Sequence, residues 1–430
     1  MSFIILVTAL SGLCIVSAGL IFSLKNREMS EKGRAESERA LEAIKTRRVI
    51  LPAEPENEEG QDLCIYKSSV EGTDYIGTLK IEKLELELSA GVNILYGDNA
   101  QGKTNVLEAL FMGCTTKSQK AAKEREVIRF GQDESHIRLY VNKGGINRKI
   151  DMHLKKNSPK GVAIDGIPIA KSAELYGMMN IISFSPDDLT IIKNGPAERR
   201  RFIDMELCQL DRSYLYNLSN YNKALTQRSM LLKQISDNKE LESTLSIWDE
   251  QLVRFGEEII SKRAEFIREM GETAADIHKT LTDDEEELKL KYVPNSAAGH
   301  LGIDLAMSHE RDIILKMNNV GPHRDDLEFE INHDDARKYG SQGQQRTVAL
   351  TLKLAEIELV KKKVGDNPVL LLDDVLSELD RNRQTQLLNS ISDIQTVITC
   401  TGLEEFVNGR ISCDRIYRVE KGTVAAADGI

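Results

Sequence analysis

The segment GDNAQGKTN, positions 97–105, constrains the fold of this chain more than any other feature. It matches G-x-x-x-x-G-K-[ST] and lies between two apolar segments, VNILY before it and NVLEALF after it. A strand that leads through a glycine-rich turn into a helix presents backbone N–H groups and a positive helix end to a phosphate. The alternative is a glycine-rich turn without a ligand. We predict a triphosphate site formed by Gly97, Asp98, Asn99, Ala100, Gln101, Gly102, Lys103, Thr104 and Asn105.

Two carboxylates are expected to complete this site. PVLLLDD, residues 368–374, is an apolar strand that ends in two acids, and the carboxyl end of a buried parallel strand faces the ligand crevice. Lys103 is placed for the β- and γ-phosphates, while Thr104 and Asp373 are predicted to bind Mg²⁺. Asp374 stands where a general base would orient the attacking water. The alternative, a simple helix cap, fits Asp380 but would be costly for Asp373 at the end of such an apolar run.

A second glycine-rich turn, in KYGSQGQQRTVAL at 338–350, also opens an apolar helical segment. It has no lysine of its own to hold a phosphate, so its partner phosphate must be held elsewhere. We predict that Ser341 and Gly343 face the γ-phosphate held by Lys103 of a second copy, so that ATP joins two protomers. A helix cap formed by Ser341 is compatible with this role.

The composition is that of an ordinary globular protein, with a net charge of −11 and a pI near 5.4. No global basic field draws the chain to nucleic acid, so any DNA contact must be a local patch. The candidates are basic residues in two clusters, with solvated faces or local ion pairs as the alternative: Arg199, Arg200 and Arg201, and Lys117, Lys120, Lys123 and Arg125. Six scattered cysteines indicate reduced thiols and no metal beyond a nucleotide-bound Mg²⁺.

Strand patterns at both ends of the globular region enclose a long stretch of helical periodicity. HIRLYV, INRKIDMHL and IISF are strand-like before residue 205, and QTVITC is strand-like near the end of the chain. This order predicts an α/β lobe made from two discontinuous halves around a mainly helical insertion. The predicted ranges are 25–74 for a charged linker, 75–205 for the first half, 206–300 for the helical lobe and 301–430 for the second half.

The N-terminal segment FIILVTALSGLCIVSAGLIFSL, residues 3–24, contains no charged residue and would cover about 30 Å as a helix. It is therefore a candidate transmembrane helix. Basic residues follow it but none precedes it, which places the remainder of the chain in the cytoplasm. A buried core helix and a cleaved signal peptide are the alternatives, and the lack of preceding positive charge argues against the latter.

Five segments together resemble the RecF family of recombination and repair ATPases, which is related to SMC proteins and ABC ATPases. They are GDNAQGKTNVLEAL (97–110), FSPDDL with KNGPAERRRFID (184–204), VGPHRDD (320–326), GSQGQQR (340–346) and LLLDDVLSELD (370–380). The resemblance covers the chain from about Tyr75 onward. It implies an ABC/SMC-type P-loop ATPase head that forms a homodimer with ATP, binds double- and single-stranded DNA at gaps, and works with RecO and RecR to load RecA.

The same resemblance assigns roles to individual residues. It implies Gly102, Lys103 and Thr104 as Walker A residues, Ser341, Gly343 and Gln344 as the signature, Asp373 and Asp374 as Walker B, and residues 377–380 as the D-loop. LKIEKLELE lacks the family's NFRNY-like turn, which leaves pairing of the first hairpin open. Asp374 stands where ABC ATPases generally carry a glutamate, and Thr401 where a histidine is common. Both changes should position water poorly, so we expect slow hydrolysis that resets a clamp.

Two other classes of function compete with this interpretation. A transporter ATPase subunit would agree with the signature and the N-terminal segment, but one helix cannot build a translocation path. An SMC-like tether at the membrane would need long heptad arms, which the sequence lacks. For His323, in GPHRDD, we predict a structural turn and not a catalytic role.

Overall fold

The computed structural model describes residues 75–81, 84–119, 126–402 and 413–427. Residues 3–24, the predicted transmembrane helix, and the predicted linker 25–74 lie outside these ranges. Within the part that is described, no helix is both long and apolar enough to cross a membrane.

A six-stranded sheet forms the centre of the nucleotide-binding lobe, and five of its strands are parallel. Its order is β15 (Thr423–Ala426), β14 (Arg415–Glu420), β3 (Val92–Tyr96), β13 (Thr396–Cys400), β12 (Val369–Asp373) and β8 (Ile181–Phe184). Strands β3 and β8 precede the helical region in the sequence, whereas β12, β13 and β14 follow it. The prediction of one α/β lobe built from two discontinuous halves is therefore confirmed.

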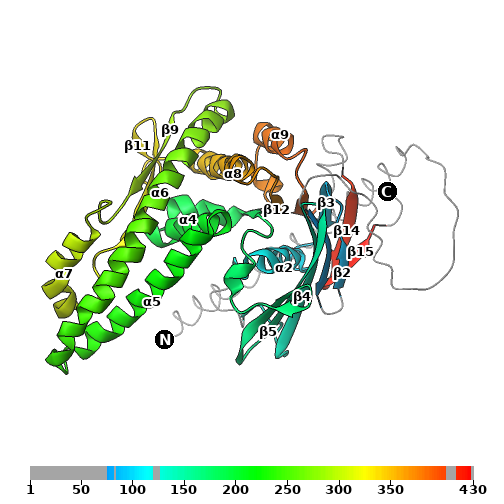
Figure 1. The fold of residues 1–430 in the computed structure, drawn as a ribbon. Helices are drawn as coiled ribbons and strands as arrows, with labels where there is room; N and C mark the ends of the chain where they lie inside the picture. Colours follow the sequence, from blue (N-terminus) through cyan, green and yellow to red (C-terminus); the bar gives the residue numbers. More distant parts are fainter. Residues whose placement is uncertain (1–74, 82–83, 120–125, 403–412, 428–430) are drawn as a thin grey trace, which may run out of the picture.

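Helices cover both faces of this sheet, which explains why its strands are continuous apolar runs. On one face Leu371 packs in a cluster with α2 (Lys103–Thr115), and on the other Leu370 and Leu372 pack with α8 (Gln342–Val364) and α9 (Arg381–Ser390). Helix α2 is itself covered on its far side by a second sheet. Figure 1 shows α2 between the two sheets.

The second sheet is antiparallel and was only partly expected. Its order is β2 (Leu84–Glu87), β1 (Tyr75–Ile81), β4 (Glu134–Lys143), β5 (Ile146–Lys155), β6 (Ser158–Ile164) and β7 (Ile167–Pro168). The first hairpin does form, with Leu79 opposite Leu86 and Ile81 opposite Leu84. The absence of the family's usual turn sequence therefore does not prevent these strands from pairing.

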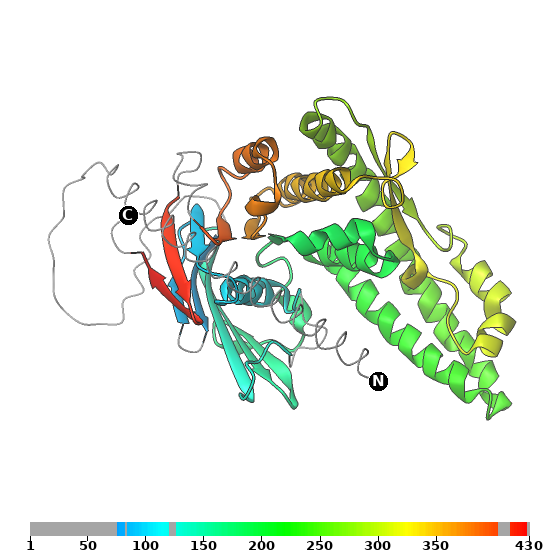
Figure 2. The same cartoon turned by 180° about the vertical axis from the view of Figure 1, so that it is seen from behind.

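The helical region lies to one side of the sheets, and α8 runs between the two parts (Figures 1 and 2). It contains α3 (Leu189–Lys193), α4 (Pro196–Leu210), α5 (Arg212–Gln234), α6 (Leu245–Leu281) and α7 (Leu301–Leu315). A small antiparallel sheet of β11 (Asp334–Asp335), β10 (Asp326–Ile331) and β9 (Leu288–Val293) packs on these helices. One apolar cluster joins α4 to α7 with the small sheet and with one side of α8.

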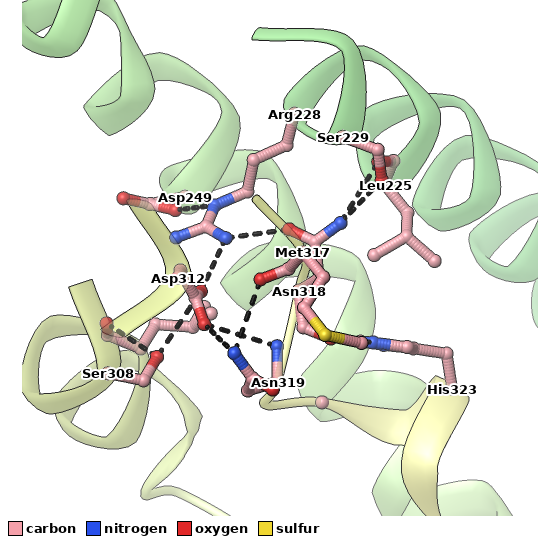
Figure 3. Close-up of polar contacts among 12 residues, drawn as sticks. Leu225, Arg228, Ser229, Asp249, Ser308, Asp312, Met317, Asn318, Asn319 and His323 are labelled. Carbon is pink, nitrogen blue, oxygen red and sulfur yellow. Dashed lines mark hydrogen bonds and ion pairs between the residues drawn. The ribbon is translucent and has the colours of Figure 1, made fainter. Parts of the chain in front are cut away.

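A fully buried arginine ties three of these elements together, as Figure 3 shows. Arg228 on α5 contacts Asp249 of α6 through Nε at 2.6 Å and Asp312 of α7 through Nη1 at 2.6 Å. The same Nη1 donates to Asn318 Oδ1 at 2.6 Å, and the carbonyl oxygen of Asn318 accepts from Arg324 Nη2 at 2.8 Å. The buried charge therefore fixes the loop that leads into the GPHRDD segment.

Candidate nucleotide site and basic cavity

The glycine-rich loop between β3 and α2 adopts backbone conformations that only glycine tolerates easily. Gly102, the N-cap of α2, has φ of 105°. A Cβ on Gly97 would lie 2.3 Å from the carbonyl oxygen of Val419, on the neighbouring strand β14. The ammonium group of Lys103 donates to the carbonyl oxygens of Gly97 at 2.7 Å and Asp98 at 3.1 Å. The loop thus holds this charge inside the turn, next to the N-terminus of a helix.

The two predicted carboxylates lie beside this loop. Thr104 Oγ1 donates to Asp373 Oδ1 at 2.9 Å, which joins the helix to the end of β12. Thr399 on β13 donates to the same oxygen at 2.8 Å and accepts from the backbone N–H of Asp374 at 2.9 Å. Asp374 has φ of 53°, a strained left-handed conformation for an aspartate. The structure therefore brings Thr104, Asp373 and Asp374 together, as predicted.

Thr399 is a site residue that the sequence did not reveal. Its role depends on β13 lying directly beside β12, where Asp373 and Thr399 are register partners. The hydroxyl and carboxylate oxygens gathered here are hard ligands of the kind that Mg²⁺ prefers. Thr104 and Asp373 would hold the ion, which would supply Lewis-acid stabilisation of the phosphate charge.

The C-terminal hairpin also contacts the glycine-rich loop. The backbone N–H of Gly422 donates to Gln101 O at 2.9 Å, and that of Lys421 donates to Gln101 Oε1 at 2.7 Å. Lys421 and Gly422 form the turn between β14 and β15. No local pattern predicts this contact, because the two segments are about 320 residues apart in the chain.

The signature residues lie at the N-terminus of α8, on the helical side of the molecule. Ser341 and Gln344 form a capping box: Ser341 Oγ accepts from the N–H of Gln344 at 3.2 Å, and Gln344 Oε1 accepts from the N–H of Ser341 at 2.8 Å. Gly343 is exposed, and an added Cβ would meet only Ser341 Oγ at 3.8 Å. Within the described ranges, no hydrogen bond joins these residues to the loop 97–105.

Asp380 caps α9 by accepting from the N–H of Arg383 at 3.0 Å, so the helix-cap interpretation holds for this acid. His323 makes the structural contacts predicted for it. Its Nδ1 lies 2.7 Å from the hydroxyl of Tyr221, and burial lowers the pKa of His323 to about 4. Asp325, on the same turn, pairs with the buried Arg263 at 2.9 Å.

The prediction that Arg199 contacts DNA is wrong for this conformation. Its side chain is 3% exposed and pairs with both oxygens of Asp326, at 2.6 and 3.0 Å. It also donates to the carbonyl oxygen of Asn194 at 2.7 Å. The local ion pair, the alternative interpretation of this cluster, applies to Arg199. The predicted contacts Lys120, Lys123 and Arg125 lie outside the described residues.

The other basic residues line a cavity of about 410 Å³ between the end of α2 and helices α4 to α6. Lys117 and Arg201 are exposed at its wall, and Arg200 is partly exposed. Arg200 and Arg201 donate to backbone carbonyl oxygens. None of the three forms an ion pair with a carboxylate in the part of the chain that the structure describes. Burial, and to a lesser extent the nearby Arg263, lowers the pKa of Arg200, so an anion bound beside it would favour its charged form.

The chain is similar to RecF proteins over most of its length. A family model described as "RecF/RecN/SMC N terminal domain" matches residues 76–425. The "DNA replication and repair protein RecF" of Lachnoclostridium phytofermentans is 62% identical over 343 residues, which span 80% of this chain and 95% of that protein. The chain belongs to the RecF family. The RecF of Agathobacter rectalis is 56% identical over 347 residues, or 81% of this chain and 96% of the relative.

A solved RecF structure has the same fold. It is described as the recombination mediator protein RecF-ATP in the RecFOR pathway, and it matches with a TM-score of 0.78 at 32% identity. The match covers 83% of this chain and 98% of that one. The fold is thus the RecF type of ABC/SMC ATPase head, as predicted. The transporter and tether alternatives gain no support from these matches.

Proposed function

We propose that this protein is a DNA replication and repair ATPase in which ATP acts as a dimerisation switch between two copies of the chain. The observation that carries the proposal is a division of the phosphate-binding groups within one chain. Lys103, Thr104 and Asp373 converge at one end of the parallel sheet. The N-terminus of α8 is capped, but no hydrogen bond joins it to these three residues within the described ranges. A second copy supplies the missing half of each site.

In this proposal each protomer binds the triphosphate through its own residues 97–105, with Mg²⁺ at Thr104 and Asp373. Ser341, Gly343 and Gln344 of the other protomer then approach the γ-phosphate, so bound ATP holds the pair together. Asp374 is the proposed base, and its short side chain makes hydrolysis slow. Hydrolysis removes the γ-phosphate and releases the pair, which resets the clamp on DNA.

Mixing two inactive variants tests this arrangement. Lys103→Ala removes the cation of one half-site, and Ser341→Arg blocks the other half. A mixed pair of these two variants keeps one complete site, so the mixture should regain part of the ATPase activity that each variant lacks alone. A wild-type chain that stays monomeric at saturating ATP, or a mixture that gains nothing, would refute the proposal.

We also propose that Lys117, Arg200 and Arg201 hold backbone phosphates of DNA at the basic cavity, near a junction of double- and single-stranded DNA. Within the ranges that the structure describes, none of the three pairs with a carboxylate, which in a chain of net charge −11 supports this assignment. The partners RecO and RecR follow from the RecFOR pathway named for the solved relative. The division of the chain into lobes remains part of the same proposal, with the helical lobe extended beyond the predicted 206–300, because α3, α4, α7 and the small sheet share one apolar cluster.

Salt dependence tests the DNA assignment. Each phosphate contact that is lost should lower the slope of log affinity against log salt by about 1, without changing sequence preference. Arg201→Ala and Lys117→Ala should both show this loss on gapped DNA. Arg311→Ala, at an exposed arginine on α7 that does not line the cavity, serves as the control. Equal slopes for all three variants and the wild type would exclude this cavity as the DNA contact.

A further inference from the structure

A chain of partly buried polar contacts runs behind the signature sequence, from α8 into the helical lobe. Gln344 Nε2 donates to Glu286 Oε1 at 2.9 Å, and the other oxygen of Glu286 lies 3.1 Å from His278 Nε2. His278, which is fully buried near the end of α6, also lies 3.0 Å from Thr351 Oγ1 through Nδ1. Thr351 is two turns further along α8. The contacts therefore begin and end on the signature helix.

This arrangement determines which way the amide of Gln344 points. The oxygen and nitrogen of a glutamine amide have nearly the same shape, so only hydrogen-bond partners decide the orientation. Glu286 accepts from the amide nitrogen, which leaves the amide oxygen to accept from the backbone N–H of Ser341. If the amide turned over, its NH₂ group would face that N–H, and the capping box would open.

The capping box in turn determines which hydrogen-bond donors at the N-terminus of α8 are available to a ligand. Ser341 Oγ accepts from the N–H of Gln344, so its own hydrogen points elsewhere. The N–H groups of Gln342 and Gly343, at the first two positions of α8, have no intrahelical acceptors. Together these donors form an anion-binding end whose shape depends on the closed capping box. Gly343 leaves open space above it, so a phosphate can approach the backbone closely.

The first turn of α8 is also fixed on the side of the D-loop. Thr347 Oγ1 donates to the carbonyl oxygen of Gly343 at 2.9 Å and accepts from Arg383 Nη2 at 2.6 Å. Arg346 pairs with Glu378 at 2.7 Å. Gln344, Thr347 and Thr351 recur at i, i+3 and i+7 of α8, so the contacts of Glu286, Arg383 and His278 follow one another along one face of this helix.

We propose that Glu286 and His278 are positioning residues for the signature sequence. Glu286 orients Gln344, His278 holds Glu286 in place, and the helix end is thereby preformed for the triphosphate on the partner protomer. This inference rests on the proposed dimerisation by ATP. It predicts a defect in association of the protomers and not in the binding of ATP to a chain's own loop at 97–105.

The experiment measures the ATP concentration that gives half-maximal dimer, by sedimentation of the full chain. Glu286→Ala should raise that concentration about tenfold, which corresponds to the loss of one hydrogen bond to a charged group. Glu286→Gln keeps an oxygen that can accept from Gln344 and should stay within about twofold of the wild type. Glu285→Ala removes the same charge from an exposed neighbour and should change nothing.

Binding of a fluorescent ATP analogue, at protein concentrations too low for dimers, supplies the second measurement. Its affinity should be equal in the wild type and all variants, because each chain's own loop is unaltered. If Glu286→Ala does not fold, His278→Ala provides the comparison, with a smaller increase of about threefold expected.

The outcomes separate the two proposals. A wild type that dimerises with ATP, together with a Glu286→Ala midpoint equal to that of Glu285→Ala, overturns the positioning role alone. A Glu286→Gln midpoint that differs from the wild type by more than about twofold also overturns it. In that case, a hydrogen-bond acceptor for Gln344 at position 286 would not be sufficient for dimerisation. A wild type that shows no ATP-dependent dimer removes both proposals.

Discussion

Removal of the Asp312 carboxylate should destabilise the helical lobe far more than removal of Asp249, although both lie 2.6 Å from the guanidinium of Arg228 (Figure 3). The difference is burial. The side chains of Arg228 and Asp312 are 0% exposed, whereas that of Asp249 is 24% exposed. Water can replace Asp249 as a partner of the arginine, but it cannot reach the position of Asp312.

The expected magnitude follows from the loss of the buried carboxylate of the two that pair with Arg228. Loss of one partner of a buried ion pair costs about 3–5 kcal/mol. Asp312→Ala also removes two hydrogen bonds from Asn319, since Asp312 Oδ1 accepts from its backbone N–H at 3.2 Å and from its Nδ2 at 2.8 Å. We therefore expect about 4 kcal/mol for Asp312→Ala. For Asp249→Ala, a pair open to solvent, about 1 kcal/mol is expected.

The single tryptophan of the chain makes a selective assay available. Trp248 is next to Asp249 on α6 and packs against the buried cluster of the helical lobe. Its fluorescence during urea unfolding reports on this lobe, and the shift of the midpoint at constant slope gives the change in free energy of unfolding.

A double-mutant cycle provides the control. Arg228→Met combined with Asp312→Ala should cost less than the sum of the two single changes, because the double variant has lost both fully buried charges, and Asp249, which remains, is partly exposed to water. Equal losses for Asp312→Ala and Asp249→Ala, or additive losses in the cycle, would refute the argument that burial decides the energy.

Three further predictions concern titration and the nucleotide loop. Burial, together with repulsion from the buried Glu356, raises the pKa of Glu206 well above its usual value. The free energy of unfolding should therefore fall as pH rises above about 4.5, where the unfolded chain releases this proton and the folded chain keeps it. Glu206→Gln should flatten this dependence in unfolding curves measured at several pH values. Burial depresses the pKa of His323 to about 4, so the stability it contributes is complete above pH 6.5 and lost as pH falls to about 4. His323→Gln should remove that acid-side loss, and an unchanged pH profile would contradict the assignment. Gly97→Ala should weaken ATP binding at least tenfold by calorimetry, since its Cβ would lie 2.3 Å from the Val419 carbonyl oxygen, whereas Gly161→Ala, with no neighbour within 4 Å, should bind normally.

The sequence by itself determined the local parts of this protein. The glycine-rich loop could be predicted because strand, turn and helix are adjacent in the chain, and the turn needs glycine for its backbone conformation. The apolar run of β12 indicated a strand buried on both faces, and that is where it lies. The caps formed by Ser341 and Asp380 also depend only on residues three positions away.

Only the tertiary structure decided which of these parts meet. Thr399 joins the site because β13 lies beside β12, and no local pattern specifies the order of strands in a sheet. Arg199 resembles its exposed neighbour Arg201 in sequence, yet it is buried by an aspartate 127 residues away. Burial and pairing of a charge depend on contacts between distant segments, whose energy exists only once the whole fold has excluded water. Periodicity and spacing along the chain therefore identify the chemical groups, and the packed fold determines their partners.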